Sequence, residues 1–121
     1  MPGVTAIDFE HPDETRSFSH GRIDLVRVGP TSIARMSLEP GWHWAEHIKP
    51  VAGTDACQNR HVGYMESGHL RVTMADGSEL DIGPGETYVI EPGHDAEVSG
   101  NEPVVALEFV TQTAEAFAKI S

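Results

Sequence analysis

Apolar and polar residues alternate in short runs along most of this chain. Leu70, Val72 and Met74, for example, are separated by single polar residues, which is the period of two expected of a strand with one buried face. Runs of this kind cover residues 22–28, 31–38, 58–66, 69–74, 79–82, 87–91, 95–98 and 103–110. Glycine and proline turns separate them at intervals of roughly six to ten residues. The pattern therefore predicts an all-β fold, either a sandwich or a barrel.

The two ends of the chain differ from this pattern. Residues 1–20 are polar, and we expect them to form an irregular N-terminal arm beside one domain, residues 21–121. A length of 121 residues is typical of a single domain. Near the C-terminus, Ala114, Phe117 and Ile120 recur at helical spacing, which predicts a short C-terminal helix.

The chain is acidic, with 8 Lys and Arg residues against 19 Asp and Glu residues and a formal net charge of −11. This balance argues against nucleic acid or an anionic membrane as a partner, because both are recognised by basic surfaces. No apolar run approaches the roughly 18 residues that a membrane-spanning helix needs, and residues 1–10 lack the features of a secretory signal. We therefore expect a cytoplasmic protein in which the single cysteine, Cys57, is reduced.

Cys57 lies four residues before His61, at the head of the predicted strand 58–66. If the strand is regular, the two side chains share one face. A thiolate and an imidazole on one face are a plausible half of a metal site. The simpler alternative is that Cys57 packs in the core as a small apolar residue and that His61 is a hydrogen-bonded core histidine.

The segment that contains Cys57 and His61 resembles the first sequence motif of the cupins, G-x5-H-x-H-x(3,4)-E-x6-G. His61 lies seven residues before Gly68 and takes the position of the motif's glutamate. Cys57 then takes the position of the second histidine. Asp55 would fall on the position of the first histidine.

The start of the motif matches better further upstream, where Gly41 is followed by five residues and His47. An insertion of residues 48–55 would reconcile the two halves and place His47 at the position of the first histidine. The resemblance then implies His47, Cys57 and His61 as ligands of one metal ion.

The second cupin motif, G-x5-P-x-G-x2-H-x3-N, resembles the stretch that contains Gly85, Pro92 and Gly93. Its histidine position falls on Ala96. His94 lies two residues earlier, and residues two apart in a strand share a face. His94 is therefore the fourth candidate ligand.

The resemblance implies a cupin-type double-stranded β-helix, which is a jelly-roll barrel, with the metal inside. Ligands from Cys and His favour Zn²⁺, with Fe, Ni or Mn as alternatives. Four protein ligands would close the site, whereas three would leave a position for water or substrate. Glu46 precedes His47 and is a candidate catalytic base, a partner that orients an imidazole, or a surface carboxylate.

Two functions are consistent with these features. The first is a metal-dependent enzyme acting on a small molecule, of isomerase, lyase or dioxygenase type. The second is a non-catalytic module that binds a small ligand, because fold does not fix function. A redox-sensitive thiol at Cys57 is a third and less favoured hypothesis. We also expect a homodimer, because small barrels must cover their edge strands.

Overall fold

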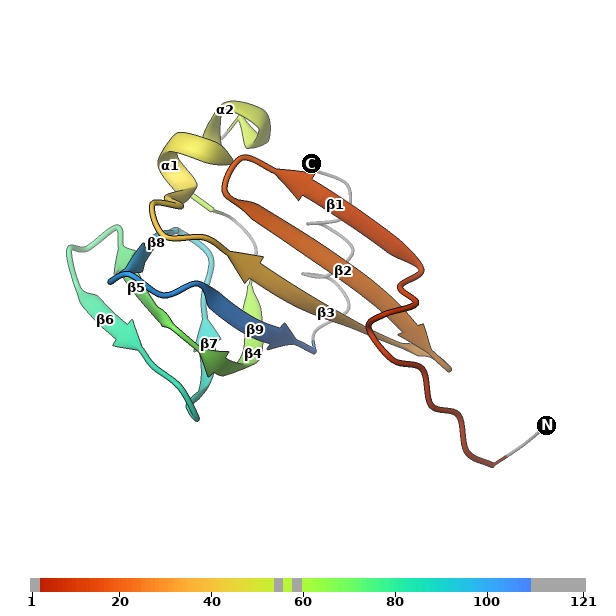
Figure 1. The fold of residues 1–121 in the computed structure, drawn as a ribbon. Helices are drawn as coiled ribbons and strands as arrows, with labels where there is room; N and C mark the ends of the chain where they lie inside the picture. The colour runs from red at the N-terminus through yellow and green to blue at the C-terminus, as the bar shows by residue number, and fades with distance from the viewer. Residues whose placement is uncertain (1–2, 54–55, 58–59, 110–121) are drawn as a thin grey trace.

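The computed structural model describes residues 3–53, 56–57 and 60–109. Its strands form two antiparallel sheets, one with the order β1-β2-β3-β9-β4-β7 and one with the order β6-β5-β8 (Figure 1). The strands are β1 (Glu14–Phe18), β2 (Gly21–Val28), β3 (Thr31–Leu38), β4 (His61–Ser67), β5 (His69–Met74), β6 (Glu79–Ile82), β7 (Thr87–Ile90), β8 (His94–Ser99) and β9 (Val104–Glu108). The prediction of an all-β fold is confirmed.

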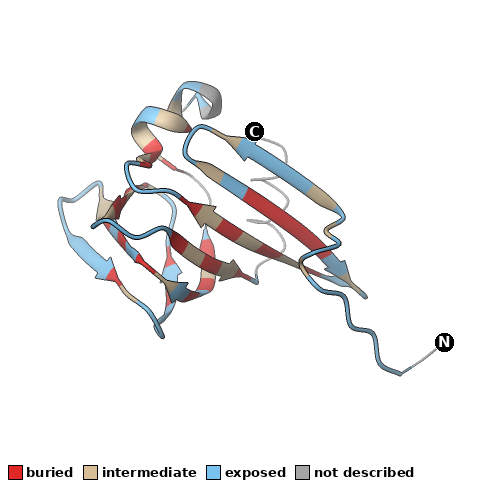
Figure 2. Ribbon diagram, in the orientation of Figure 1, coloured by how far each residue is buried: buried red, intermediate tan, exposed pale blue. Residues whose placement is uncertain are grey.

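The core lies between the two sheets, where the inward residues of each strand meet (Figure 2). In β3, Ala34, Met36 and Leu38 are buried and alternate with less buried residues. In β5, Leu70 and Val72 do the same from the opposite sheet. The alternation seen in the sequence is therefore the inside–outside pattern of a two-layer β structure.

Two elements differ from the sequence-based expectation. The segment predicted to be an irregular arm contains β1, which pairs along β2 as an edge strand. Alternation does not reveal β1 because its residues are exposed or only partly buried, so backbone pairing rather than apolar burial defines it. The predicted C-terminal helix lies outside the described residues.

The second difference is a pair of short helices, α1 (Trp44–His47) and α2 (Lys49–Ala52), at one end of the barrel (Figure 1). Trp44 and Ile48 are both buried, at the i, i+4 spacing of one helix face. Gly53 ends α2 in the left-handed conformation, with φ of 75°. Single turns of helix are too short to produce a detectable helical period. Among the described residues, no helix has the length and apolar character to span a membrane.

The segment that leads into α1 is fastened along β8. The Val98 N–H donates to the Trp42 carbonyl over 2.9 Å. The Asp95 carboxylate accepts hydrogen bonds from the Ala45 N–H over 3.2 Å and from His43 Nε2 over 2.6 Å. Burial by itself lowers the pKa of His43, but the hydrogen bond and the charge of Asp95 outweigh it and raise the pKa.

Replacing His43 with glutamine should destabilise the protein in a pH-dependent way. A histidine whose pKa is raised in the folded state stabilises the fold fully below its unfolded pKa, and this contribution disappears as the pH rises through the folded pKa. We expect a loss of about 1 to 2 kcal/mol in unfolding free energy at about pH 5.5 and a smaller loss at about pH 8.5. Urea denaturation at both pH values measures the difference. His69→Gln, at an exposed position, is the control, and equal losses at the two pH values for His43→Gln would contradict the interpretation.

Candidate metal centre

Three potential metal ligands meet inside the barrel: Cys57, His61 and His94. One ligand atom from each residue lies within 4.8 Å of the other two. All three residues are buried. Among the described residues, these three form the group of Cys, His, Asp or Glu side chains that is suited to hold a metal ion.

Backbone pairing brings Cys57 to this position from outside the named strands. Cys57 and His94 form an isolated antiparallel bridge. The Cys57 N–H donates to the His94 carbonyl and the Gly93 N–H donates to the Cys57 carbonyl, both over 2.7 Å. Strand β4 begins only at His61. We expected one strand to carry both Cys57 and His61. Instead, Cys57 is placed by its bridge to His94 and His61 by the pairing of β4.

His61 stands between the thiol and a buried carboxylate. Its Nδ1 donates to Glu108 Oε1 over 2.6 Å, and its Nε2 lies 3.7 Å from the Cys57 sulfur. Burial alone lowers the pKa of His61, but the hydrogen bonds to Cys57 and Glu108 outweigh it and raise the pKa to about 9.

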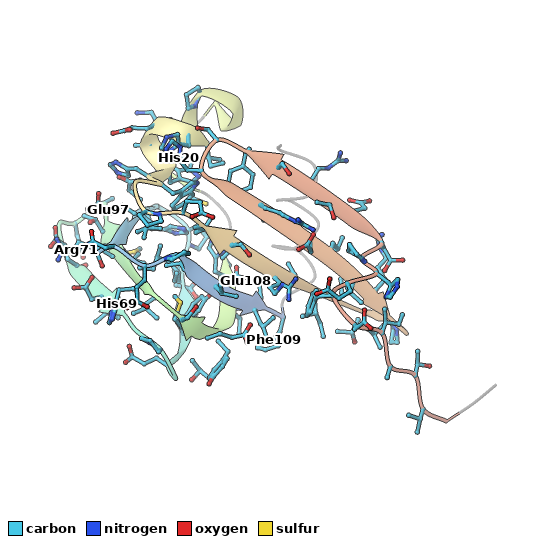
Figure 3. All side chains as sticks on the ribbon, viewed as in Figure 1. His20, His69, Arg71, Glu97, Glu108 and Phe109 are labelled. Carbon is cyan, nitrogen blue, oxygen red and sulfur yellow. The ribbon has the colours of Figure 1, made fainter. Side chains whose placement is uncertain are left out.

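The Glu108 carboxylate is itself held by a second partner. The Tyr88 hydroxyl donates to Glu108 Oε2, so each carboxylate oxygen accepts one hydrogen bond. Burial, followed by the charge of Glu108, raises the pKa of Tyr88 well above its usual range, so the phenol stays protonated. Glu108 projects from β9 toward the interior (Figure 3). This chain from Tyr88 through Glu108 fixes the orientation of the His61 ring.

His94 is oriented by the backbone. Its Nδ1 lies 2.7 Å from the Glu91 carbonyl oxygen, which can only accept a hydrogen bond. The neutral ring therefore carries its proton on Nδ1 and leaves the Nε2 lone pair available to a metal. The rings of His61 and His94 meet edge to face, with centroids 4.9 Å apart.

The spacing of the donors suits a tetrahedral metal ion. With a Zn–S bond of about 2.3 Å, a Zn–N bond of about 2.0 Å and a tetrahedral angle, the sulfur and nitrogen ligands are about 3.5 Å apart. The distance from the Cys57 sulfur to His61 Nε2 is 3.7 Å. A thiolate and two imidazoles also match the preference of Zn²⁺ for sulfur and nitrogen. The residues therefore fit such an ion without rearrangement of this pair.

The structure does not bring His47 or Glu46 into the group. His47 lies in α1, where its Nδ1 accepts a hydrogen bond from the His43 N–H over 3.0 Å and its ring lies 4.5 Å from that of His20. Glu46 is mostly exposed, and its carboxylate lies 3.7 Å from His43 Nδ1. The roles proposed for His47 as a ligand and Glu46 as a base stay predictions. Both residues lie in α1, and this helix holds them apart from the three donors.

Sequence reasoning missed Glu108 and Tyr88. Both carry a detectable signal, because each lies at an inward position of a strand whose other inward residues are apolar. In β9 the inward residues are Val104, Ala106 and Glu108. A carboxylate in that pattern must have a buried partner, and this requirement could have identified Glu108.

A small cavity of about 30 Å³ adjoins the three donors, with room for about two water molecules. Its walls are almost entirely apolar. They are formed by Met36, Leu38, Trp42, Trp44, Cys57, His61, Leu70, Tyr88, Ile90, His94 and Ala96. The donors therefore face a small, largely apolar space.

Comparisons with known proteins establish the fold. No protein-family model and no curated protein sequence matches the chain. Among solved structures, ectoine synthase from P. lautus aligns with a TM-score of 0.64 at 11% identity, over 96% of this chain and 86% of its own. The polyketide cyclase RemF from Streptomyces resistomycificus aligns with a TM-score of 0.60 at 15% identity, over 88% and 78%. A cupin-like protein from Thermotoga maritima aligns with a TM-score of 0.56 at 16% identity, over 88% and 82%.

The chain has the fold of the cupin superfamily. The expected jelly-roll architecture is thereby confirmed. The cupin neighbours are distant in sequence, so the role of this site has to be argued from its own residues.

Gly63 provides the space in which the carboxylate sits. In the sheet ladder it is opposite Tyr88 on one side and Glu108 on the other. A Cβ at this position would lie 2.3 Å from the Leu107 carbonyl oxygen and 2.7 Å from both Glu108 Oε2 and the Tyr88 hydroxyl. Only a residue without a side chain leaves these groups in contact.

Replacing Gly63 with alanine should therefore destabilise the protein and displace Glu108. We expect a loss of about 2 to 3 kcal/mol in unfolding free energy, as for other overpacked cores. Urea denaturation measures this loss. Gly3→Ala is the control, because nothing lies within 4 Å of its added Cβ. Equal stability of the Gly63→Ala and Gly3→Ala proteins would show that the packing around Glu108 is not tight.

Proposed function

We propose that this protein is a metal-dependent enzyme that acts on a small molecule inside the barrel. The observation that carries the proposal is the convergence of Cys57, His61 and His94 on one buried point. Both imidazoles are anchored through Nδ1. Three protein donors leave one position of a tetrahedral ion for water or substrate, which is the arrangement of catalytic rather than structural sites.

Zn²⁺ is the metal we favour. Thiolate and imidazole ligands bind it well, and its tetrahedral preference matches the spacing of Cys57 and His61. Copper also binds sets of two histidines and one cysteine, and Fe or Ni accept such ligands. Mn is the weakest of the alternatives because it prefers oxygen ligands.

A metal bound here would supply a Lewis acid that polarises a substrate oxygen and acidifies a bound water. The protein's own groups prepare the site for that chemistry. Glu108 holds the Nδ1 proton of His61 and Tyr88 holds Glu108. The apolar walls limit access of bulk water, which strengthens every electrostatic interaction inside.

The structural neighbours support a small-molecule enzyme. RemF is described as a polyketide cyclase, and a second neighbour is described as an ectoine synthase. Both names denote conversions of small organic molecules. On this basis we place the activity among isomerase, lyase or dioxygenase reactions. From the composition of the chain and its need to cover edge strands, we also propose a cytoplasmic homodimer.

The small size of the cavity favours a second function, in which the barrel holds a ligand or a metal without turnover. A space for about two water molecules admits few substrates without movement of its walls. The two functions differ in coordination. An exchangeable fourth ligand on the bound metal supports catalysis, and a fourth protein ligand supports a structural or holding role.

Removal of any of the three donors should abolish tight metal binding. We expect Cys57→Ala, His61→Ala and His94→Ala each to lower zinc affinity by more than about 100-fold, because each removes a direct ligand. The measurement is zinc titration calorimetry on protein purified without a histidine tag, together with metal analysis by mass spectrometry. His69→Ala, at an exposed position, should bind zinc like the wild type.

Absence of stoichiometric metal in the wild type would refute the proposal, as would retention of full affinity in all three alanine variants. His47→Ala, measured in parallel, decides the fourth position. We expect no loss of affinity, because His47 lies outside the donor group. A loss comparable with that of Cys57→Ala would make His47 a ligand and would favour the holding function.

Glu108→Gln should weaken metal binding without removing a ligand. The amide keeps the shape of the side chain but loses the negative charge that makes His61 a better donor. We expect zinc affinity to fall by about 10- to 100-fold, measured by the same titration. Glu86→Gln, a change to an exposed carboxylate in the turn before β7, is the control. Unchanged affinity in Glu108→Gln would show that the carboxylate serves folding alone.

A further inference from the structure

A groove lies on the side of the barrel where the two sheets end beside each other. Strand β7 is the last strand of the larger sheet and β6 is the last strand of the smaller one, and among the described strands no ladder joins the two. The groove has a volume of about 470 Å³. Sites for small molecules typically measure about 300–1,000 Å³. Its inner wall is formed by the inward residues of β5, β6 and β7, which are Val72, Met74, Leu80, Ile82, Tyr88 and Ile90.

Leu80 shows that the barrel interior can be reached from this groove. Leu80 and Ile82 lie two residues apart in β6, so their side chains share the inward face. Ile82 is 3% exposed, whereas Leu80 is 66% exposed. An apolar side chain on an inward face is normally covered by the facing sheet, and here it is left open to a molecule that enters the groove.

The groove shares a wall with the small cavity beside the three metal donors. Tyr88 and Ile90 line both spaces. Tyr88 is held in place by the hydrogen bond from its hydroxyl to Glu108. Ile90 lies directly opposite His61 in the ladder between β4 and β7, and its apolar side chain has no hydrogen bond that fixes its rotamer. Of the two residues, Ile90 is therefore the one whose side chain can move to connect the groove with the donors.

The charges around the groove limit what it can bind. Carboxylates line it, and none of the described lining residues is Lys or Arg. These carboxylates belong to Glu79, Asp81, Glu86 and Glu91. Arg60 and Arg71 lie outside the lining and are paired, with Glu91 over 2.9 Å and with Asp81 over 3.4 Å. An anion in the groove would be repelled without a lining cation to balance it, so the lining favours an uncharged apolar molecule.

We propose that this groove binds the apolar body of the substrate, and that the reactive end of the substrate reaches the metal by passing Ile90. The inference rests on the proposed function, because the cavity of about 30 Å³ beside the donors is too small for a whole substrate. The substrate is an uncharged small molecule with an apolar body and one oxygen that can bind the metal. Ile90 limits the width of the end that carries this oxygen.

Two fluorescent probes that share one apolar body test the groove. N-phenyl-1-naphthylamine is uncharged, and 8-anilinonaphthalene-1-sulfonate adds a negative charge to the same rings. We expect the wild type to bind the uncharged probe, and to bind the sulfonate more weakly by about tenfold or more. Leu80→Ser should bind the uncharged probe about three- to tenfold more weakly, because apolar contact area is lost. Val4→Ser, at a position that is 82% exposed and outside the groove, is the control and should bind like the wild type.

Cys57 reports whether the groove leads to the donors. It is the single cysteine of the chain, lines the small cavity and is 3% exposed. Metal-free protein is treated with methyl methanethiosulfonate, and mass spectrometry follows the modification of the thiol. Saturation of the groove with N-phenyl-1-naphthylamine should slow this modification several-fold, because the bound probe blocks the path past Ile90.

A pair of matched variants tests Ile90 itself. Ile90→Val should speed the modification of Cys57 by about two- to tenfold, as expected when a methylene group is removed from a packed wall. Ile82→Val makes the same change at a buried position that lines the groove but not the small cavity. Both changes cost similar stability, so a faster reaction in Ile90→Val than in Ile82→Val separates local passage from general unfolding.

The outcomes separate the two proposals, because none of these measurements needs a bound metal. If the wild type takes up no metal, the proposed function fails, and the link between groove and metal fails with it. If metal binds, this inference alone is overturned by any of three results: equal binding or no binding of the two probes, unchanged modification of Cys57 in the presence of the uncharged probe, or equal rates in Ile90→Val and Ile82→Val. A second copy of the chain in the groove would also overturn it, and would appear as probe binding that weakens as protein concentration rises.

Discussion

The hydrogen bond between Glu108 and His61 is the interaction on which this barrel depends most. The Glu108 side chain is only 1% exposed. An unpaired carboxylate that is buried to this degree destabilises a protein by about several kcal/mol, even after the surroundings relax. Here one oxygen accepts from His61 and the other from Tyr88. Gly63 leaves the space in which these groups meet. The residues around the candidate metal centre are therefore constrained by the same requirement that keeps the core stable.

The site holds reactive polar atoms in an apolar interior because each histidine uses its two ring nitrogens differently. His61 and His94 each donate Nδ1–H to an acceptor in the protein, and His61 Nε2 faces the Cys57 sulfur. Their anchors differ in kind, since Glu108 is a charged side chain and the Glu91 carbonyl belongs to the backbone. Trp42 is the exception, because its donor has no partner among the described residues.

Alternation of apolar and polar residues was sufficient to predict most strands and the two-layer fold, because one buried face imposes a period of two. It could not predict α1 and α2, whose single turns are defined by Trp44, Ile48 and the cap at Gly53. For the site, spacing within the motif identified Cys57 and His61, which the backbone does bring together. Motif spacing alone does not predict the path of an inserted segment. It therefore could not show that His47 lies in α1, outside the group of three donors. Glu108 is far in sequence from Cys57 and His61, so no motif links it to them. Predicting its role would have required the argument that a carboxylate at an inward strand position needs a buried partner.

The placement of β9 also sets the order in which the site can form during protein synthesis. Strand β9 is the last described strand of the chain, yet it lies between β3 and β4 in the centre of the larger sheet. A ribosome-bound chain that ends before Glu108 already contains Cys57, His61 and His94 but has neither the central strand nor the carboxylate that orients His61. Contacts of such long sequence separation form late and slow the folding of β proteins. The geometry suited to a metal ion is thus complete only once β9 has joined the sheet.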